Sequence, residues 1–428
     1  MNDILVIGGG PAGAVTALLL ARAGWQVELV DRQRFPRPKP CGDCLSAAAT
    51  PLLARLGLLE RVLALRPARL RGWTLRARGG ASFSGDFAGA DPLAPDALAV
   101  SRSRLDATLL DAARETGVRV RTSVRTEHLL IEGRSVVGAR GRSAPQGMPW
   151  SARARLTVGA DGLRSVVARR LGCVGHAARV RKLSLTAHLD DVEGLEARGT
   201  MVVGDGWCVG VAPVTAAADA AASSAGAANV TVVLAGARAA GRVKRSPAAA
   251  FWATIQDAGL AGRLERARCA VTGAAAGAAG LHLLASGPFD RPVRRVAGAG
   301  SALVGDAAGY FDPFTGQGVY HALASAEILA EEADAALRRG VVDAATLRGY
   351  VARRAQLIGS ALALQRGIEA CVARPRLFRF AARRLASAPA VTASLIAATG
   401  GLLPPPRLLS PALALSFLLA VPASEVPA

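Results

Sequence analysis

The sequence predicts an α/β protein with two main domains and a helical C-terminal segment. Three observations support this fold class. A strand, a glycine-rich turn, a helix and a second strand follow one another within the first 31 residues, which is the pattern of a βαβ unit. Longer alternating strands dominate residues 173–295, as in an antiparallel sheet with one buried face. From residue 341 onward the pattern is helical, apolar and rich in arginine.

The composition favours a globular protein without a nucleic-acid partner. The chain has 428 residues, 51% of them hydrophobic, which is enough to bury the cores of two domains. The formal net charge is +20, but only three of the 52 basic residues are lysines, and the arginines are spread along the chain instead of forming one stripe. Such spreading indicates a compositional bias. We therefore expect no nucleic-acid site.

The six cysteines, at positions 41, 44, 173, 208, 269 and 371, form neither a dense framework nor a metal-binding pattern. The single CxxC pair has no second pair or histidine cluster at zinc-like spacing, so we expect free thiols, no metal and a cytoplasmic location. No apolar run reaches the roughly 18 residues of a membrane span. The Ala- and Ser-rich tract at 215–228 is expected to be a hairpin loop.

The N-terminal βαβ unit carries a GxGxxG turn, which is typical of a dinucleotide-binding site. We expect Gly8 to allow the tight turn, Gly10 to let the backbone approach a pyrophosphate, and Gly13 to let helix and strand pack closely. The helix should start just after Gly10, so that its N-terminus faces the phosphates. The residues that we expect to contact the dinucleotide here are Gly8, Gly10, Pro11, Ala12, Gly13, Asp31 and Arg32.

Two later segments carry related chemistry. A buried strand leads into Asp161 and Gly162, and another leads into Gly305 and Asp306. A turn with Pro313, Gly316 and Gly318 follows, and then a helix over about 318–339. A carboxylate such as Asp306 accepts strongly from sugar hydroxyls, and the N–H groups at a helix start stabilise negative charge. The structural alternatives are a helix cap for Asp306 and a turn residue for Asp161.

Together these motifs resemble the FAD-dependent oxidoreductases of the p-hydroxybenzoate hydroxylase type, which include aromatic monooxygenases, geranylgeranyl reductases and flavin-dependent halogenases. The resemblance covers about residues 1–340. It implies FAD bound by the three motifs, with Arg102 near the phosphates. It also implies a Rossmann-like FAD-binding domain of the glutathione-reductase type. The expected division is 1–172 with 296–340 for FAD, 173–295 with part of 70–99 for the substrate on a second α+β domain with a mostly antiparallel sheet, and 341–428 for the helical region.

The segment Lys39-Pro40-Cys41-Gly42 resembles the Cys-Gly segment of the geranylgeranyl reductase branch and of related hydroxylases. This implies that Cys41 and Gly42 lie near the flavin. Cys41 is the one candidate catalytic residue, as a proton donor; it could instead shape the pocket or act as a small buried hydrophobe. The aromatic strand of prenyl reductases is matched only in part at 206–213, and no lysine is well placed for the halogenase reaction.

The leading hypothesis is therefore an NAD(P)H-dependent FAD monooxygenase that hydroxylates a small, hydrophobic aromatic or polyketide-derived substrate through a flavin C4a-hydroperoxide. The alternative is a geranylgeranyl-reductase-like enzyme that reduces isoprenoid C=C bonds. The five histidines form no visible triad and are expected to be structural. Residues 375–387 form an amphipathic basic helix, which could pack on the FAD-binding domain or make peripheral contact with an anionic membrane.

Overall fold

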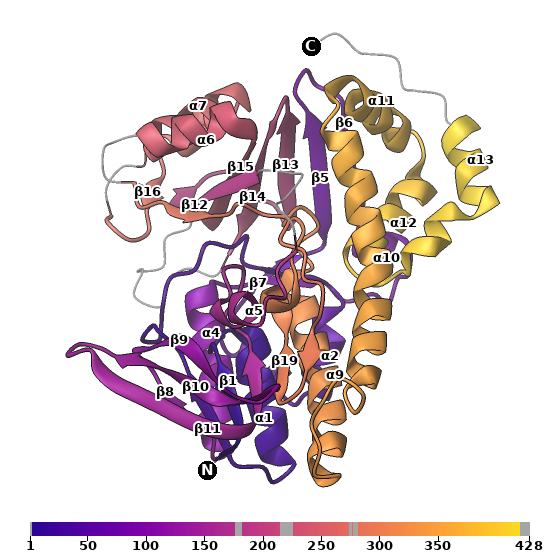
Figure 1. Cartoon of the computed structure of the whole chain (residues 1–428). Helices are drawn as coiled ribbons and strands as arrows, with labels where there is room; N and C mark the ends of the chain where they lie inside the picture. The colour runs from indigo at the N-terminus through magenta and orange to yellow at the C-terminus, as the bar shows by residue number, and fades with distance from the viewer. Residues whose placement is uncertain (1, 176–181, 215–225, 274–275, 277–280, 420–428) are drawn as a thin grey trace.

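The computed structural model describes residues 2–175, 182–214, 226–273, 276 and 281–419, and its ribbon shows two sheets flanked by helices (Figure 1). Most of the alanine-rich tract, residues 215–225, lies outside the described residues, and Gly226 already begins a strand. The expectation of a hairpin loop is therefore untested over most of that tract.

The first sheet has the order β18-β19-β11-β1-β2-β8, and its neighbours are parallel except at β18. Its strand β1 is buried from Ile4 onward, and Ile4, Leu5 and Val6 have no exposed surface. The strands of this path are β1 (Asn2–Ile7), β2 (Val27–Val30), β8 (Arg119–Arg121), β11 (Met148–Gly159), β18 (Ala297–Gly298) and β19 (Ser301–Leu303). Strands β9 (Val124–Glu132) and β10 (Ser135–Ser143) extend the N-terminal half of β11 as an antiparallel hairpin.

Helices cover the first sheet and share its core. They are α1 (Pro11–Arg22), α4 (Arg102–Glu115), α5 (Val166–Arg170), the 3-10 turn η2 (Gly305–Ala308) and α9 (Gly318–Arg338). Helix α1 contacts both α4 and α9. Its first eight residues are small or apolar, and all of them are buried. The predicted α9 matches the observed helix to within a residue at its end.

The second sheet has the order β16-β12-β15-β14-β13-β5-β6, with β17 beside β12. It is antiparallel except where β13 meets β5 in parallel. Two of its strands come from the segment 70–99. Its strands are β5 (Gly72–Ala77), β6 (Ser82–Asp86), β12 (Lys182–Val192), β13 (Arg198–Gly204), β14 (Trp207–Pro213), β15 (Gly226–Ala235), β16 (Arg268–Cys269) and β17 (Leu284–Ser286).

Three helices interrupt the strands that the sequence pattern placed over 173–295, namely α6 (Gly236–Arg245), α7 (Pro247–Asp257) and α8 (Ala261–Leu264). The alternation of the flanking strands hid them. Phe251 and Ile255 of α7 are fully buried in the core that covers one face of the second sheet, so the helices are needed to seal it. Figure 1 shows α6 and α7 together beside this sheet.

A small third sheet links the two main ones. It pairs β7 (Ala97–Ala99) with β3 (Cys44–Leu45) on one side and with β4 (Ala68–Leu70) on the other. The remaining short elements of this region are α2 (Ala49–Arg55), α3 (Leu59–Leu63) and η1 (Phe87–Gly89).

The C-terminal region is helical, as predicted. Its elements are α10 (Arg348–Val372), α11 (Pro375–Ala386), α12 (Pro389–Thr399), η3 (Pro405–Leu409) and α13 (Pro411–Leu419). In α11, Phe378 and Leu385 are buried where the helix contacts β5 and β6, whereas Leu377, expected on the same apolar face, is 44% exposed. The apolar face of α11 thus packs on the second sheet, not on the FAD-binding domain. Within the described chain, no helix combines the length and hydropathy that crossing a bilayer requires.

Candidate active site

A cavity of about 1080 Å³, partly open to solvent, brings together most of the predicted site residues between the two main sheets. Its lining includes Gly10, Pro11, Ala12, Cys41, Gly42, Arg102, Gly162, Gly305, Asp306, Pro313, Gly316 and Gly318. Five predicted residues do not line it: Gly8, Gly13, Asp31, Arg32 and Asp161. Four of these five support the cavity wall from behind, while the side chain of Arg32 is exposed.

Gly13 permits the close packing that the GxGxxG spacing predicts. A Cβ atom at position 13 would lie 1.9 Å from the carbonyl oxygen of Gly8, and Gly8 itself has a φ of 110°. Asp31 braces the same turn, because its carboxylate accepts from the Gly9 N–H at 2.7 Å. This contact leaves the Asp31 carboxylate, which is 8% exposed, beside the turn instead of in the cavity.

The carboxylate of Asp161 caps a helix. It accepts from Ser165 Oγ at 2.5 Å and from the Val166 N–H at 2.6 Å, at the start of α5. The side chain of Asp161 is thus engaged within the strand-to-helix turn, as its structural alternative states, and Gly162 lines the cavity. Asp306 behaves differently, because its side chain does not cap the turn in which it lies, and it lines the cavity. A carboxylate at this position can accept from sugar hydroxyls.

Two helix N-termini open into the cavity. Neither α1 nor α9 has a side-chain cap or an acidic residue in its first turn. Their first N–H groups and their dipoles therefore favour a negatively charged ligand. The flanking residues Gly10 and Gly318 line the cavity, so the two positive helix ends converge on one space.

Three basic side chains add positive charge near these helix ends. Arg102 lines the cavity and holds a bidentate ion pair with the fully buried Asp106, at 2.7 and 2.9 Å. Lys39 also lines the cavity, and burial together with the Arg102 charge lowers the pKa of Lys39. Arg37 Nε is buried and has no hydrogen-bond partner within the described part of the chain. Another nitrogen of its guanidinium pairs with Asp106 at 3.4 Å, and Arg37 itself does not line the cavity.

This donor set fits FAD. Two uncapped helix ends with the cations Arg102 and Lys39 suit its pyrophosphate, while Asp306 suits the ribityl chain. Lys39 was missed as a site residue, although it stands in the proline-rich loop beyond Asp31. Lys39 lies beside Gly162 in the cavity wall, and the expectation that no lysine is well placed for the halogenase reaction stays a prediction.

The loop that carries Cys41 is fastened by a buried polar network. Asn229 Nδ2 donates to the Cys41 carbonyl at 2.7 Å and to Asp43 Oδ2 at 2.9 Å. His188 contacts the same Asp43 carboxylate. Burial raises the pKa of the Cys41 thiol, although the Arg102 charge opposes this, so the thiol is a neutral proton carrier at pH 7. Sequence patterns gave no signal for His188 or Asn229, because they lie far from Cys41 along the chain.

The second sheet presents Thr231 to the cavity as a hydrogen-bond acceptor. Its single hydroxyl proton goes to Asn229 Oδ1 at 2.8 Å, and the Asn229 amide is oriented by its contacts to the Cys41 loop. The 2.9 Å contact between Thr186 and Thr231 must therefore have Thr186 as the donor. Thr231 keeps one lone pair for a ligand, and that ligand must be a donor, such as a phenolic O–H.

Comparison with known proteins agrees with this geometry. Residues 1–206 match the protein-family model described as FAD binding domain. The chain is 29% identical over 356 residues to the menaquinone reductase of Mycobacterium tuberculosis, covering 78% of this chain and 76% of that protein. The chain is an FAD-dependent oxidoreductase of the p-hydroxybenzoate hydroxylase-like superfamily. The predicted family and its Rossmann-like fold are thus confirmed.

Other proteins match shorter segments of the chain or its fold. 6-Methylpretetramide 4-monooxygenase of Streptomyces rimosus is 31% identical over 172 residues, covering 40% of this chain and 41% of that protein. The solved structure of a myxobacterial chondrochloren halogenase has a TM-score of 0.71 at 26% identity, covering 83% of this chain and 79% of that one. A flavoprotein/dehydrogenase from Cytophaga hutchinsonii has a TM-score of 0.77 at 21% identity, covering 94% and 92%, and shows the fold alone.

Proposed function

We propose that this FAD-dependent oxidoreductase is a monooxygenase that uses NAD(P)H and O2 to hydroxylate a phenolic or polyketide-derived aromatic substrate. The observation that carries the proposal is Thr231, an acceptor-only hydroxyl in the wall of the FAD cavity. A phenolic O–H can donate to the remaining lone pair of Thr231, whereas a hydrocarbon double bond cannot. This acceptor therefore favours a hydroxylated ring.

Bound FAD would supply electron transfer and oxygen activation, and the chain supplies the surroundings. The helix starts at α1 and α9, with Arg102 and Lys39, hold its negative charge. Thr231 orients the ring, and the second sheet excludes water from the reacting face. The arrangement needs no catalytic base, which agrees with the absence of any triad among the described residues lining the cavity.

Reduction of isoprenoid C=C bonds is the second candidate. It is supported by the menaquinone reductase relatives, whose match extends over 78% of this chain, whereas the monooxygenase named above matches 40%. It is also supported by the position of Cys41, a neutral thiol at the cavity that could donate a proton to a carbanionic carbon. In that reaction the isoprenoid chain of the substrate, not its ring, would lie over the cofactor.

One experiment separates the two candidates. The holoenzyme is incubated with NADPH or NADH and either a 4-alkylphenol or an isoprenoid quinone. Each reaction is run in air and under anaerobic conditions, and the product masses are measured by mass spectrometry. We expect the phenol to gain one oxygen atom in air, with O2 consumed. A gain of two hydrogen atoms by the isoprenoid under anaerobic conditions, with no oxygenated phenol, would overturn the proposal in favour of the reductase.

A further inference from the structure

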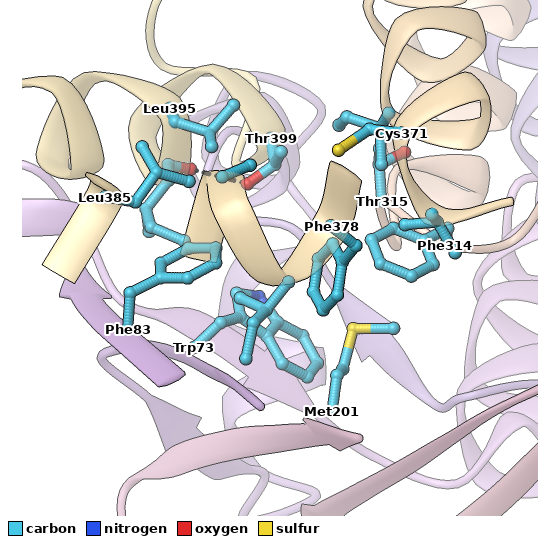
Figure 2. A pocket seen from close by; sticks show the side chains of 15 residues that line it. Trp73, Phe83, Met201, Phe314, Thr315, Cys371, Phe378, Leu385, Leu395 and Thr399 are labelled. Atoms are coloured by element: carbon cyan, nitrogen blue, oxygen red, sulfur yellow. Dashed lines mark hydrogen bonds between the residues drawn. The ribbon is translucent and has the colours of Figure 1, made fainter. Parts of the chain in front are cut away.

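A second space lies between the second sheet and the C-terminal helices. It measures about 630 Å³, and its lining is almost wholly apolar. Figure 2 shows Phe83 and Leu385 at one end, Phe314 and Thr315 at the other, and Trp73 and Met201 on the sheet below. We call this space the apolar pocket.

The few hydroxyls of the apolar pocket are already engaged. Thr399 Oγ1 donates to the Ile396 carbonyl at 2.8 Å, and Thr315 Oγ1 accepts from Gln365 Nε2 at 2.7 Å. The pocket therefore offers a ligand apolar area and aromatic rings, with little that requires a polar partner. A hydrocarbon chain is the ligand chemistry that this lining favours.

The strand register places the apolar pocket and the FAD cavity along one row of the sheet. Thr231 pairs with Gly210, Gly210 pairs with Met201, and Met201 pairs with Leu75. Paired residues of neighbouring strands point to the same face. Thr231 lines the FAD cavity, and both Met201 and Leu75 line the apolar pocket. The face thus changes from polar to apolar across this row, with Gly210 at the boundary.

The boundary is open at Gly210. A Cβ atom at this position would meet no side chain within 4 Å, and its nearest contact is the Thr231 carbonyl at 3.9 Å. The loop that follows Asp312 also contributes to both spaces, because Phe314 lines the apolar pocket while Pro313 and Gly316 line the FAD cavity. The two spaces are therefore neighbours on one face of the sheet, and between Thr231 and Met201 the sheet carries no side chain at Gly210.

We propose that the apolar pocket binds the hydrocarbon tail of the substrate, whose hydroxylated ring lies against Thr231 in the FAD cavity. The substrate class is then a phenol with an alkyl or isoprenoid chain of several carbons, rather than a small free phenol. The inference rests on the proposed function, which supplies the ring and its place at the cofactor. It adds the tail, the site that holds it, and Gly210 as the point where tail and ring meet.

The test measures binding without turnover. Phenol and 4-alkylphenols with one, five and nine carbons in the chain are titrated into oxidised holoenzyme without NAD(P)H, and affinity is followed by calorimetry. We expect the affinity to rise about fourfold for each methylene that enters the pocket. Equal affinity for the short and long chains would overturn the proposal.

Two variants locate the tail. Gly210→Val puts a side chain at the boundary between the two spaces, and valine is well tolerated in a strand. Ala381→Phe fills part of the apolar pocket. In both variants the affinity should rise much less with alkyl-chain length, so that the nine-carbon phenol binds at least tenfold more weakly than to wild type. Phenol itself should bind within twofold of its wild-type affinity. Ala386, like Ala381, lies on α11, but it is exposed. Ala386→Phe is therefore the matched control and should keep the rise in affinity with chain length. A rise in affinity that is unchanged in both pocket variants would exclude this site.

The outcomes separate this inference from the proposed function. If tail-dependent binding is found but no phenol is oxygenated when NAD(P)H and O2 are added, the apolar pocket stands and the monooxygenase proposal fails. If phenols are oxygenated with no dependence on chain length in KM or in binding, the function stands and the tail site fails. Circular dichroism and FAD content of each variant verify that the holoenzyme has folded.

Discussion

His188 Nε2 lies 2.5 Å from Asp43 Oδ2, and this contact joins the second sheet to the loop that carries Cys41. On its other side Asp43 accepts from the backbone N–H of Arg102 at the start of α4. The Asp43 side chain is almost fully buried, and its backbone has a φ of 56°. The Asp43 carboxylate therefore connects the loop that carries Cys41, the start of α4 in the first domain and the second sheet. It does so at a position where the backbone is strained.

This pair makes stability depend on pH. Burial opposes protonation of His188, but the hydrogen bond to Asp43 and its charge outweigh burial and raise the pKa of His188. A raised pKa in the folded state gives stability that is fully present below the usual value of about 6.5 and is lost as the pH rises through the raised value. We expect His188→Gln to destabilise the protein by roughly 1–3 kcal/mol at pH 6 and by less at pH 9.

Urea denaturation of both proteins at the two pH values measures this difference. His128→Gln is the control, because His128 lies on β9 of the first sheet, away from the network around Asp43. Asp190 and Cys269 also raise the pKa of His188, so Asp43→Asn should reduce the pH dependence without abolishing it. A loss of stability in His188→Gln that is the same at pH 6 and pH 9 would show that the pair carries no charge.

Cys41 distinguishes the two candidate reactions. Burial raises the pKa of this thiol, so it is protonated at neutral pH and would serve as an acid, not as a nucleophile. For a monooxygenase we expect Cys41→Ala to keep the turnover number within about threefold, because no proton from this side chain is needed. For a C=C reductase the same change should lower it by about 10²–10⁴, the usual contribution of a general acid.

Single-turnover kinetics with each substrate, monitored by mass spectrometry, give that comparison. Cys208→Ala is the matched control, because burial also raises the pKa of this thiol, to about 12, but Cys208 does not line the FAD cavity. If the proton of Cys41 takes part in the reaction, Cys41→Ser should be faster than Cys41→Ala. If the thiol only shapes the cavity, the rates of both variants should stay close to that of wild type.

Much of the cofactor half could be predicted from the sequence, because its geometry is set by local patterns. Gly13, Asp306 and the start of α9 are each placed by the strand, turn and helix around them. The wall over the cavity could not be predicted in the same way. Thr231, Asn229 and His188 reach the site through strand register, and no short-range pattern encodes which strands become neighbours.

Asp161 shows the limit of motif matching in the other direction. The Asp-Gly pair matches its motif, yet the carboxylate is used by the first N–H groups of α5, and the cofactor role of the side chain stays a prediction. The helices of 236–264 were missed because their buried residues are few and are spaced between strong strand patterns. Both cases arise where tertiary context decides among local alternatives.

Gly13→Ala tests the glycine turn. The added methyl group would lie 1.9 Å from the Gly8 carbonyl oxygen, so the start of α1 must move away from the sheet. We expect purified Gly13→Ala to contain little or no FAD, or to be insoluble, as measured by flavin absorbance per protein. Gly262→Ala is the control, since a Cβ there meets nothing within 4 Å. Full FAD content in Gly13→Ala would contradict the packing described here.

Lys182 links the second sheet to both the flavin-side loop and the C-terminal helices. Its ammonium contacts Asp312 at 3.1 Å, directly before Pro313, and it also contacts Glu369 of α10. Burial opposes the charge of Lys182, but the two carboxylates outweigh it and raise the pKa of Lys182. Lys182→Met leaves the buried Asp312 and the partly buried Glu369 without this cation, and we expect it to lower the free energy of unfolding by about 3–5 kcal/mol at pH 7.

The pH dependence of this loss identifies its cause. Burial raises the pKa of Glu369, and the charge of Lys182 opposes this rise. Without the lysine, the variant should therefore regain stability as the pH falls towards about 4 and this carboxylate becomes neutral. Arg153→Met, which breaks an exposed ion pair with Glu132, should change the stability little at any pH. Because Asp312 precedes the loop that lines the FAD cavity, Lys182→Met should also weaken FAD binding, as measured by fluorescence titration. Unchanged FAD affinity together with a pH-independent loss of stability would mean that Lys182 contributes through packing alone.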